Sequence, residues 1–164
     1  MRIPREAARV ALLDPAARSS CSATTTRGVG VHWAMPDGGL EPGETPHKTA
    51  RRELREETGW TELEPGPPLC AWEHDDTRAG VPVRQHEHID RAAGPRRGPA
   101  DHLAAAHTED KILAWRWWPP DGPAAAPEPL WPPQLPAQPS RTPHAPPVDL
   151  GYVASPPPAG RPGR

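Results

Sequence analysis

The sequence predicts an α/β protein in which one long helix lies against a sheet of short strands. The helix is expected over residues 46–58. Thr45 can cap its start with a hydroxyl, Pro46 suits the first helical position, and Gly59 suits the left-handed position just past the end. Short apolar segments on both sides of the helix indicate strands. A length of 164 residues allows one domain, which we place at residues 5–135.

Three segments before the helix differ in how strongly they predict strands. Residues 7–13 are apolar and end at Asp14-Pro15, which indicates a first strand and a turn. Residues 19–27 contain threonines but almost nothing to bury, so we expect the strand there to be frayed or absent. Residues 29–33 form a short apolar approach to a glycine-rich loop.

A pair of short strands is expected after the helix, at residues 69–74 and 81–86. Pro82 indicates an edge strand, because proline has no amide proton to give to a neighbouring strand. His86 and His88 stand beside acidic residues. This arrangement can bind zinc, but a His-x-His pair in a polar strand is also commonly solvated.

Residues 111–118 alternate as a strand does, which places Trp115 and Trp117 on one face. We expect these tryptophans to be core residues rather than a platform on which bases stack. Glu109 and Asp110 just before this strand are candidates for an additional catalytic or metal-binding carboxylate.

The loop at residues 91–101 is basic and rich in glycine and proline. Arg96 and Arg97 could contact a substrate phosphate or could keep the loop soluble. Both interpretations are compatible with the sequence, and we favour the second.

The composition of the chain limits how much of it can fold. The 27 prolines and 14 glycines make up about a quarter of the residues, a level typical of low-complexity segments. Prolines are dense from Pro119 onward, so a closing helix cannot run uninterrupted there. We therefore expect residues 136–164 to form a disordered, proline-rich tail.

Charge and cysteine content restrict the expected partners and compartment. A net charge of -2 provides no basic field for nucleic acid, which we do not expect as a partner. Cys21 and Cys70 lack metal-ligand spacing and are expected to be reduced, which favours the cytoplasm. No apolar run approaches the roughly 18 residues of a membrane span, so no membrane partner is expected.

The expected helix carries three carboxylates on one face, because Glu53, Glu56 and Glu57 are spaced at i, i+3 and i+4. Arginines interleave with them, so this could be a solvated face of ion pairs. Alternatively, the carboxylates could hold divalent cations, since Mg²⁺ and Mn²⁺ prefer oxygen ligands. Residues 37–44 favour the second alternative, because their glycines let the backbone turn sharply into the start of the helix.

Gly38, Glu44 and residues 52–60 together match the pattern Gx5Ex7REUxEExGU, in which U is a bulky apolar residue. This segment resembles a complete Nudix box. The resemblance implies an α/β/α sandwich with a mixed sheet, and Mg²⁺- or Mn²⁺-dependent hydrolysis of a nucleoside diphosphate linked to another moiety. Asp37 stands where many relatives have a further glycine.

The resemblance also implies roles for individual residues. The implied metal ligands are Glu53, Glu56, Glu57 and the backbone carbonyl of Gly38. Glu53 is implied to act as a metal ligand or as the catalytic base, and Arg52 as the residue that orients Glu44. The alternative is a catalytically silent or degenerate Nudix-like protein that binds a nucleotide. Neither the nucleotide derivative nor the oligomeric state follows from the sequence.

Overall fold

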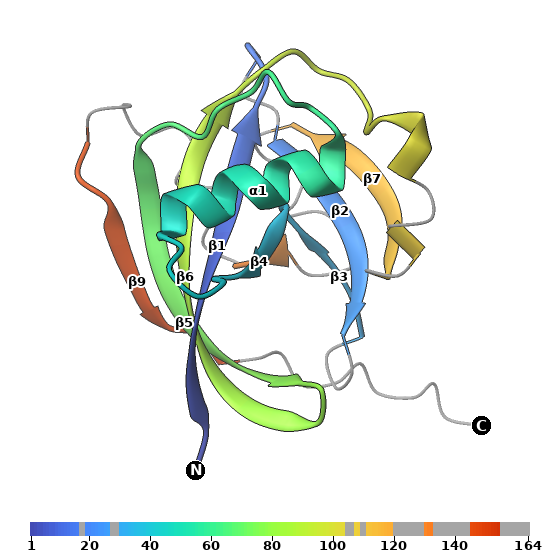
Figure 1. Ribbon diagram of the computed structural model, residues 1–164. Helices are drawn as coiled ribbons and strands as arrows, with labels where there is room; N and C mark the ends of the chain where they lie inside the picture. The colour runs from blue at the N-terminus through green and yellow to red at the C-terminus, as the bar shows by residue number, and fades with distance from the viewer. Residues whose placement is uncertain are drawn as a thin grey trace.

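A computed structural model describes residues 1–16, 19–26, 30–103, 107–108, 111–119, 130–132 and 145–154. Within these residues the helix α1 (Pro46–Thr58) crosses one face of a nine-stranded sheet (Figure 1). The strands are β1 (Ile3–Leu13), β2 (Ser19–Thr26), β3 (Gly30–Ala34), β4 (Asp37–Gly39), β5 (Pro68–Arg78), β6 (Val81–Ala93), β7 (Ile112–Trp118), β8 (Leu130–Trp131) and β9 (Val148–Tyr152). A single turn of 3-10 helix spans Asp101–Leu103.

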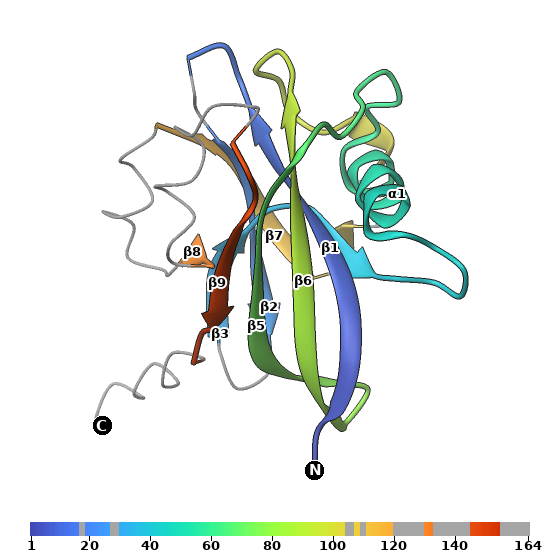
Figure 2. The same cartoon turned by 90° about the vertical axis from the view of Figure 1, so that its left-hand side faces the viewer.

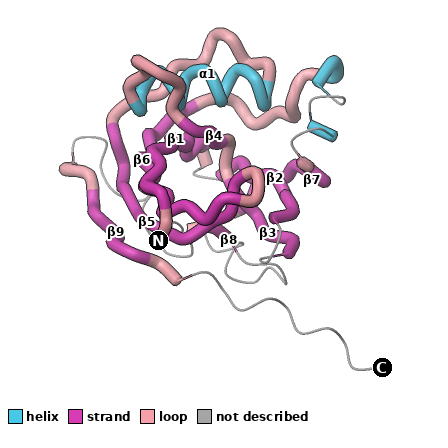
Figure 3. The backbone as a smooth tube through the Cα atoms, turned by 60° about the horizontal axis from the view of Figure 1, so that its bottom comes forward, coloured by secondary structure: helices cyan, strands magenta, loops and turns pink. Residues whose placement is uncertain are grey.

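The sheet is mixed and runs in the order β8-β3-β2-β1-β6-β5-β9, with β4 paired to β1 and β7 paired to β2. Its centre is the parallel pair β1 and β6, from Ile3 opposite Val83 to Leu13 opposite Ala93. Figure 2 shows α1 on one side of this pair. Figure 3 shows the sheet curling on the other side, so that the strands enclose an interior.

Alternation along β1 divides the core in two, because successive side chains of a strand point to opposite faces. Val10 and Leu12 face α1 and pack with the buried side chain of Leu54. Ala11 faces the curled interior. The buried residues that pack with it there are Met35, Leu69, Cys70, Trp72, Ile89, Trp118 and Leu130.

The helix has the predicted bounds and the predicted caps. The Thr45 hydroxyl accepts a hydrogen bond of 3.3 Å from the backbone N–H of Lys48, and Pro46 occupies the first turn. Gly59 has a φ of 73°, and its N–H donates to the carbonyl of Arg55 at 2.8 Å. In the part of the chain that the structure describes, no helix combines the length and apolar character needed to cross a membrane.

The expectation that residues 19–27 would be frayed or absent as a strand is wrong, because β2 is formed over Ser19–Thr26. It pairs with β3 on one side and with β7 on the other. Two flanking strands satisfy its backbone, and its threonines favour extended structure, so the strand does not depend on long aliphatic side chains.

The expectation that Pro82 marks an edge strand is also wrong, since β6 lies between β1 and β5. Pro82 pairs with Thr77 of β5, whereas pairing with β1 begins one residue later at Val83. The proline therefore lies at the end of a central strand, before the neighbour that would need its missing N–H.

The prediction of a disordered tail over residues 136–164 does not hold for β9. This strand pairs in parallel with β5, and the N–H of Val153 donates to the carbonyl of Glu73 at 2.8 Å. Val148, Leu150 and Val153 pack against the interior core. These spaced apolar residues supply a buried face that the surrounding prolines obscured. The prediction for a closing helix falls largely on residues 120–129 and 133–144, which lie outside the described residues.

Candidate active site

The carboxylate side of α1 meets the backbone of β4 at Gly38. This residue pairs with Ala8 of β1, which fixes its position in front of the helix. A Cβ atom placed on Gly38 would overlap the carboxylate of Glu53. The absence of a side chain at Gly38 thus lets the Glu53 carboxylate lie close to the backbone of β4.

The three helix carboxylates lie at different depths. The Glu56 side chain is 58% exposed, whereas that of Glu53 is 12% exposed and Glu57 is buried. Burial raises the pKa of Glu53 to about 7 despite the neighbouring Arg52. Burial, followed by the charge of Asp37, also raises the pKa of Glu57 well above its usual value. The site thus concentrates negative charge where water screens it poorly.

Arg52, which contacts Glu53, also forms a bidentate ion pair with Glu44. Arg52 Nε donates to Glu44 Oε1 at 3.0 Å, and Arg52 Nη2 donates to Glu44 Oε2 at 2.9 Å. The same Nη2 donates to the carbonyl of Gly39, and Nη1 donates to Glu53. Hydrogen bonds from Arg52 lower the pKa of Glu44 to about 2. The structure therefore joins the loop, β4 and the helix through one guanidinium group.

A buried ionic network in the curled interior was missed from the sequence. The Arg9 guanidinium donates to Glu87 through Nε at 2.6 Å and through Nη2 at 2.9 Å. Trp72 Nε1 also donates to Glu87 at 2.7 Å, and His74 Nε2 lies 3.0 Å from the same carboxylate. Although burial acts to raise it, Arg9 and His74 hold the pKa of Glu87 well below its usual value. The sequence did offer one signal for this network, because Arg9 and Glu87 are charged residues within the strands β1 and β6, which are largely buried.

Asp37 connects this network to the helix carboxylates. Its carboxylate lies 3.4 Å from Arg9 Nη2, and its backbone N–H donates to Glu57 at 3.2 Å. Asp37 therefore adds a negative charge beside Glu57.

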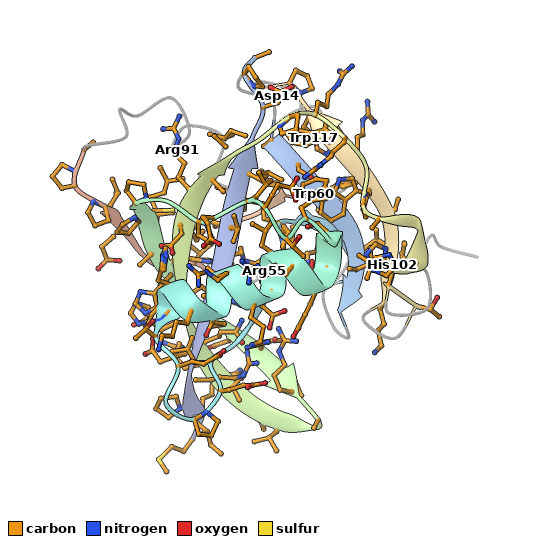
Figure 4. The ribbon with its side chains drawn as sticks, turned by 45° about the horizontal axis from the view of Figure 1, so that its top comes forward. Asp14, Arg55, Trp60, Arg91, His102 and Trp117 are labelled. Atoms are coloured by element: carbon orange, nitrogen blue, oxygen red, sulfur yellow. The ribbon has the colours of Figure 1, made fainter. Side chains whose placement is uncertain are left out.

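Other residues singled out in the sequence lie away from these carboxylates. Trp60 stacks on Trp117 with ring centroids 6.3 Å apart, and Trp115 meets Trp60 edge-on at 6.1 Å. Figure 4 shows Trp60 and Trp117 together at the far end of α1. Trp115 and Trp117 are partly buried and pack against the core beneath α1, which agrees with the prediction that they serve the core. Arg97 lies over the Trp60 ring and pairs with Glu62, so its charge is used locally.

Two predicted residues cannot be placed. Glu109 and Asp110 lie outside the described residues, so they remain candidates from the sequence alone.

Glu87 is adjacent in sequence to His86 and His88, yet its side chain points to the opposite face of β6, as the alternation of a strand requires.

Comparisons with known proteins agree with this architecture. The NUDIX domain family model matches residues 4–138. The RNA pyrophosphohydrolase of Erythrobacter litoralis (strain HTCC2594) is 33% identical over 110 residues, covering 54% of this chain and 60% of that protein. The match thus spans less than two thirds of that relative.

Solved structures with a similar backbone include three proteins described as MutT or NUDIX. The MutT protein from Methanosarcina mazei Go1 has a TM-score of 0.60 at 12% identity, covering 78% of this chain and 86% of that one. The NUDIX domain of Shewanella oneidensis NrtR, solved with ADP ribose, has a TM-score of 0.60 at 16% identity, covering 84% of this chain and 87% of that one. The MutT NUDIX hydrolase from Burkholderia pseudomallei has a TM-score of 0.58 at 21% identity, covering 77% of this chain and 89% of that one. These similarities confirm the predicted fold.

Proposed function

Because the chain belongs to the Nudix family, we propose that it is a hydrolase that cleaves a nucleoside diphosphate linked to another moiety, with Mg²⁺ or Mn²⁺ as cofactor. The observation that carries the proposal is the contact between Gly38 and the Glu53 carboxylate, beside the buried Glu57. A solvated face of ion pairs would not need buried carboxylates.

The donor set fits a hard divalent cation. Glu53, Glu56, Glu57 and the Gly38 carbonyl offer only oxygen atoms, which Mg²⁺ and Mn²⁺ prefer. The raised pKa values of Glu53 and Glu57 reflect burial and mutual repulsion, which a cation among them would relieve. When bound, such a cation neutralises the pyrophosphate charge and makes water a stronger nucleophile.

The chain's own residues would then position the reactants. Arg52 holds Glu44 and the Gly39 carbonyl, so it fixes the loop that presents Gly38 to the helix. Glu53 is a ligand or the general base, since a pKa of about 7 lets it accept a proton near neutral pH. Arg52 and Glu44 therefore act by orienting the site, while the glutamates of α1 act on the reactants.

Two substrate classes should be screened. Nucleoside diphosphate derivatives are the class we propose, and the NrtR domain solved with ADP ribose makes ADP ribose a sensible first compound. The similarity to an RNA pyrophosphohydrolase adds the phosphorylated end of an RNA as a second class. The net charge of -2 counts against extended RNA contacts, so the small nucleotide is our first choice.

The test replaces Glu56 with Gln, which keeps the size and helix propensity of the residue but removes its charge. Phosphate release from both substrate classes should fall at least about a hundredfold with Mg²⁺ or Mn²⁺, a barrier increase of about 2.7 kcal/mol. The matched control is Glu62→Gln. Glu62 lies beyond the helix end and pairs with Arg97 at the surface, so its loss should change activity little.

Two results would count against the proposal. Equal turnover by the wild-type chain and Glu56→Gln would mean that the carboxylates of α1 form a solvated face without a catalytic role. Tight nucleotide binding without turnover, under all metal and substrate conditions, would instead support the catalytically silent alternative.

A further inference from the structure

A second cluster of potential metal ligands lies on β1 and β6, on the face of the sheet that carries α1. It consists of Glu6 on β1 and of His86 and His88 on β6. In the parallel pairing Glu6 is opposite His86, and Ala8 is opposite His88. Ala8 belongs to the core beneath α1, so the alternation of the strands places all three cluster residues on the helix side.

The ligand atoms of the three side chains converge. His86 Nδ1 lies 3.3 Å from Glu6 Oε1, and His88 Nε2 lies 2.7 Å from Glu6 Oε2. One ligand atom from each residue fits within a mutual separation of 4.8 Å. Two ligands bound tetrahedrally at about 2.0 to 2.1 Å from zinc are about 3.4 Å apart, so the cluster needs little rearrangement to hold one ion.

The backbone beneath the cluster is fixed. His86 and His88 lie inside β6, which is paired along its length with β1 and with β5. Glu6 lies inside the same parallel pairing, and its carbonyl accepts a hydrogen bond of 3.1 Å from the N–H of Leu40. Ligands on rigid, adjacent strands lose little conformational freedom when they bind an ion.

The cluster is also open to solvent. The side chains of Glu6, His86 and His88 are 51%, 37% and 33% exposed. Among the described residues, Glu6 forms ion pairs with these histidines and with no lysine or arginine. An ion could therefore enter from solvent and keep a water molecule as its fourth ligand.

We propose that Glu6, His86 and His88 form a metal site for a divalent transition metal of the Zn²⁺ class, separate from the carboxylates of α1. Two imidazoles and one carboxylate are a donor set that suits Zn²⁺, whereas Mg²⁺ prefers oxygen ligands alone. The site bridges β1 and β6, so the bound ion stabilises the folded chain by mass action. This site does not depend on the proposed hydrolase activity.

The test is a Zn²⁺ titration of the untagged, full-length chain by calorimetry and thermal unfolding, in excess Mg²⁺ to compete for the helix carboxylates. Wild type should bind one Zn²⁺ and unfold at a higher temperature with it. His86→Gln and His88→Gln should each weaken binding by more than about tenfold, because even residues that only orient a ligand cost about 10- to 100-fold when removed.

Two controls separate this site from its surroundings. His47→Gln removes a nearby histidine of α1 that contacts Asp90 instead of Glu6, and it should retain Zn²⁺ binding. Glu56→Gln alters the candidate active site and should also retain it. Conversely, His86→Gln should hydrolyse substrate as the wild type does, so the two sites can fail independently.

Several results would overturn the proposal. One is unchanged Zn²⁺ affinity in folded His86→Gln and His88→Gln, and another is loss of binding in Glu56→Gln. If either histidine variant fails to fold by circular dichroism, X-ray absorption of the Zn²⁺-loaded wild type decides the matter. Two imidazole ligands support the site, and a shell of oxygen alone excludes it.

Discussion

Glu57 and Glu87 are both glutamates that the fold buries, yet their pKa values move in opposite directions. Glu57 lies beside Asp37 and Glu53, so charge repulsion adds to the effect of burial and raises its pKa. Glu87 lies against Arg9, and donors from Trp72 and Gln85 complete its hydrogen bonds. Glu57 is thus surrounded mainly by like charge, whereas Glu87 is surrounded by an opposite charge and by hydrogen-bond donors. The first arrangement suits a site that receives a cation, and the second suits a permanent structural network.

The strongest test of this comparison is Glu87→Gln. The new amide group would turn an N–H donor toward Arg9 in place of one carboxylate oxygen. The buried Arg9 charge would lose the negative charge of Glu87 and would keep that of Asp37, 3.4 Å away. We expect the free energy of unfolding to fall by about 3 to 5 kcal/mol, as for other broken buried ion pairs. Urea denaturation followed by circular dichroism measures it.

The matched control for this variant is Glu73→Gln on the neighbouring strand β5. The Glu73 side chain is 43% exposed and lies 3.9 Å from Arg84, so its substitution should cost under about 1 kcal/mol. Equal stabilities for the two variants would mean that the interior network contributes nothing beyond a surface pair.

The second test, Glu57→Gln, should have the opposite effect on stability. Burial and the charge of Asp37 disfavour the ionised form of Glu57, so a neutral amide in its place should leave the metal-free chain as stable as wild type or more so. Activity should nevertheless fall at least about a hundredfold, or about 2.7 kcal/mol, because a proposed metal ligand is lost. Parallel denaturation and turnover assays measure both quantities. A large loss of stability would show that Glu57 is a structural residue like Glu87.

The sequence predicted the first of these regions and missed the second for a physical reason. The helix bounds, its caps and its carboxylates depend on residues within one short segment, where local rules of capping and spacing apply. Arg9 and Glu87 are 78 residues apart in sequence. Only the pairing of β1 with β6 brings them together, and no local pattern specifies that pairing.

The strands show the same limit. β2 was underestimated because its stability comes from β3 and β7 on either side, and composition alone does not reveal neighbours. β9 was missed because Val148, Leu150 and Val153 are few among many prolines, although they cover an otherwise open edge of β5. Sequence patterns thus predicted the helix better than the sheet that supports it.

The third test removes β9 by ending the chain after Gln138. β9 pairs with β5, which carries Trp72 and His74 of the Glu87 network, and its apolar residues pack on the interior core. We expect a loss of about 1 to 3 kcal/mol in unfolding free energy, from three partly buried aliphatic side chains. Removing only residues 155–164 is the control and should change stability little. An unchanged stability after the longer deletion would show that β9 does not protect the interior.

The smallest expected effect is a pH dependence that distinguishes the helix site from the interior network. Burial raises the pKa of Glu53 from 4.5 to about 7, so between these values the folded metal-free chain binds more protons at this residue than the unfolded chain does. Stability from this group should therefore be greatest below about pH 4.5 and should be lost as pH rises through about 7.

Glu53→Gln isolates this contribution, because the amide cannot titrate. The unfolding free energies of wild type and Glu53→Gln are measured without divalent metal from pH 5 to pH 8. The unfolding free energy of wild type should fall relative to that of Glu53→Gln as pH rises. Adding Mg²⁺ should reduce this slope, since the cation favours the ionised carboxylate. The opposite slope would mean that Arg52 stabilises the ionised form of Glu53, as Arg9 stabilises that of Glu87. Both regions would then hold a glutamate in its charged form through an arginine.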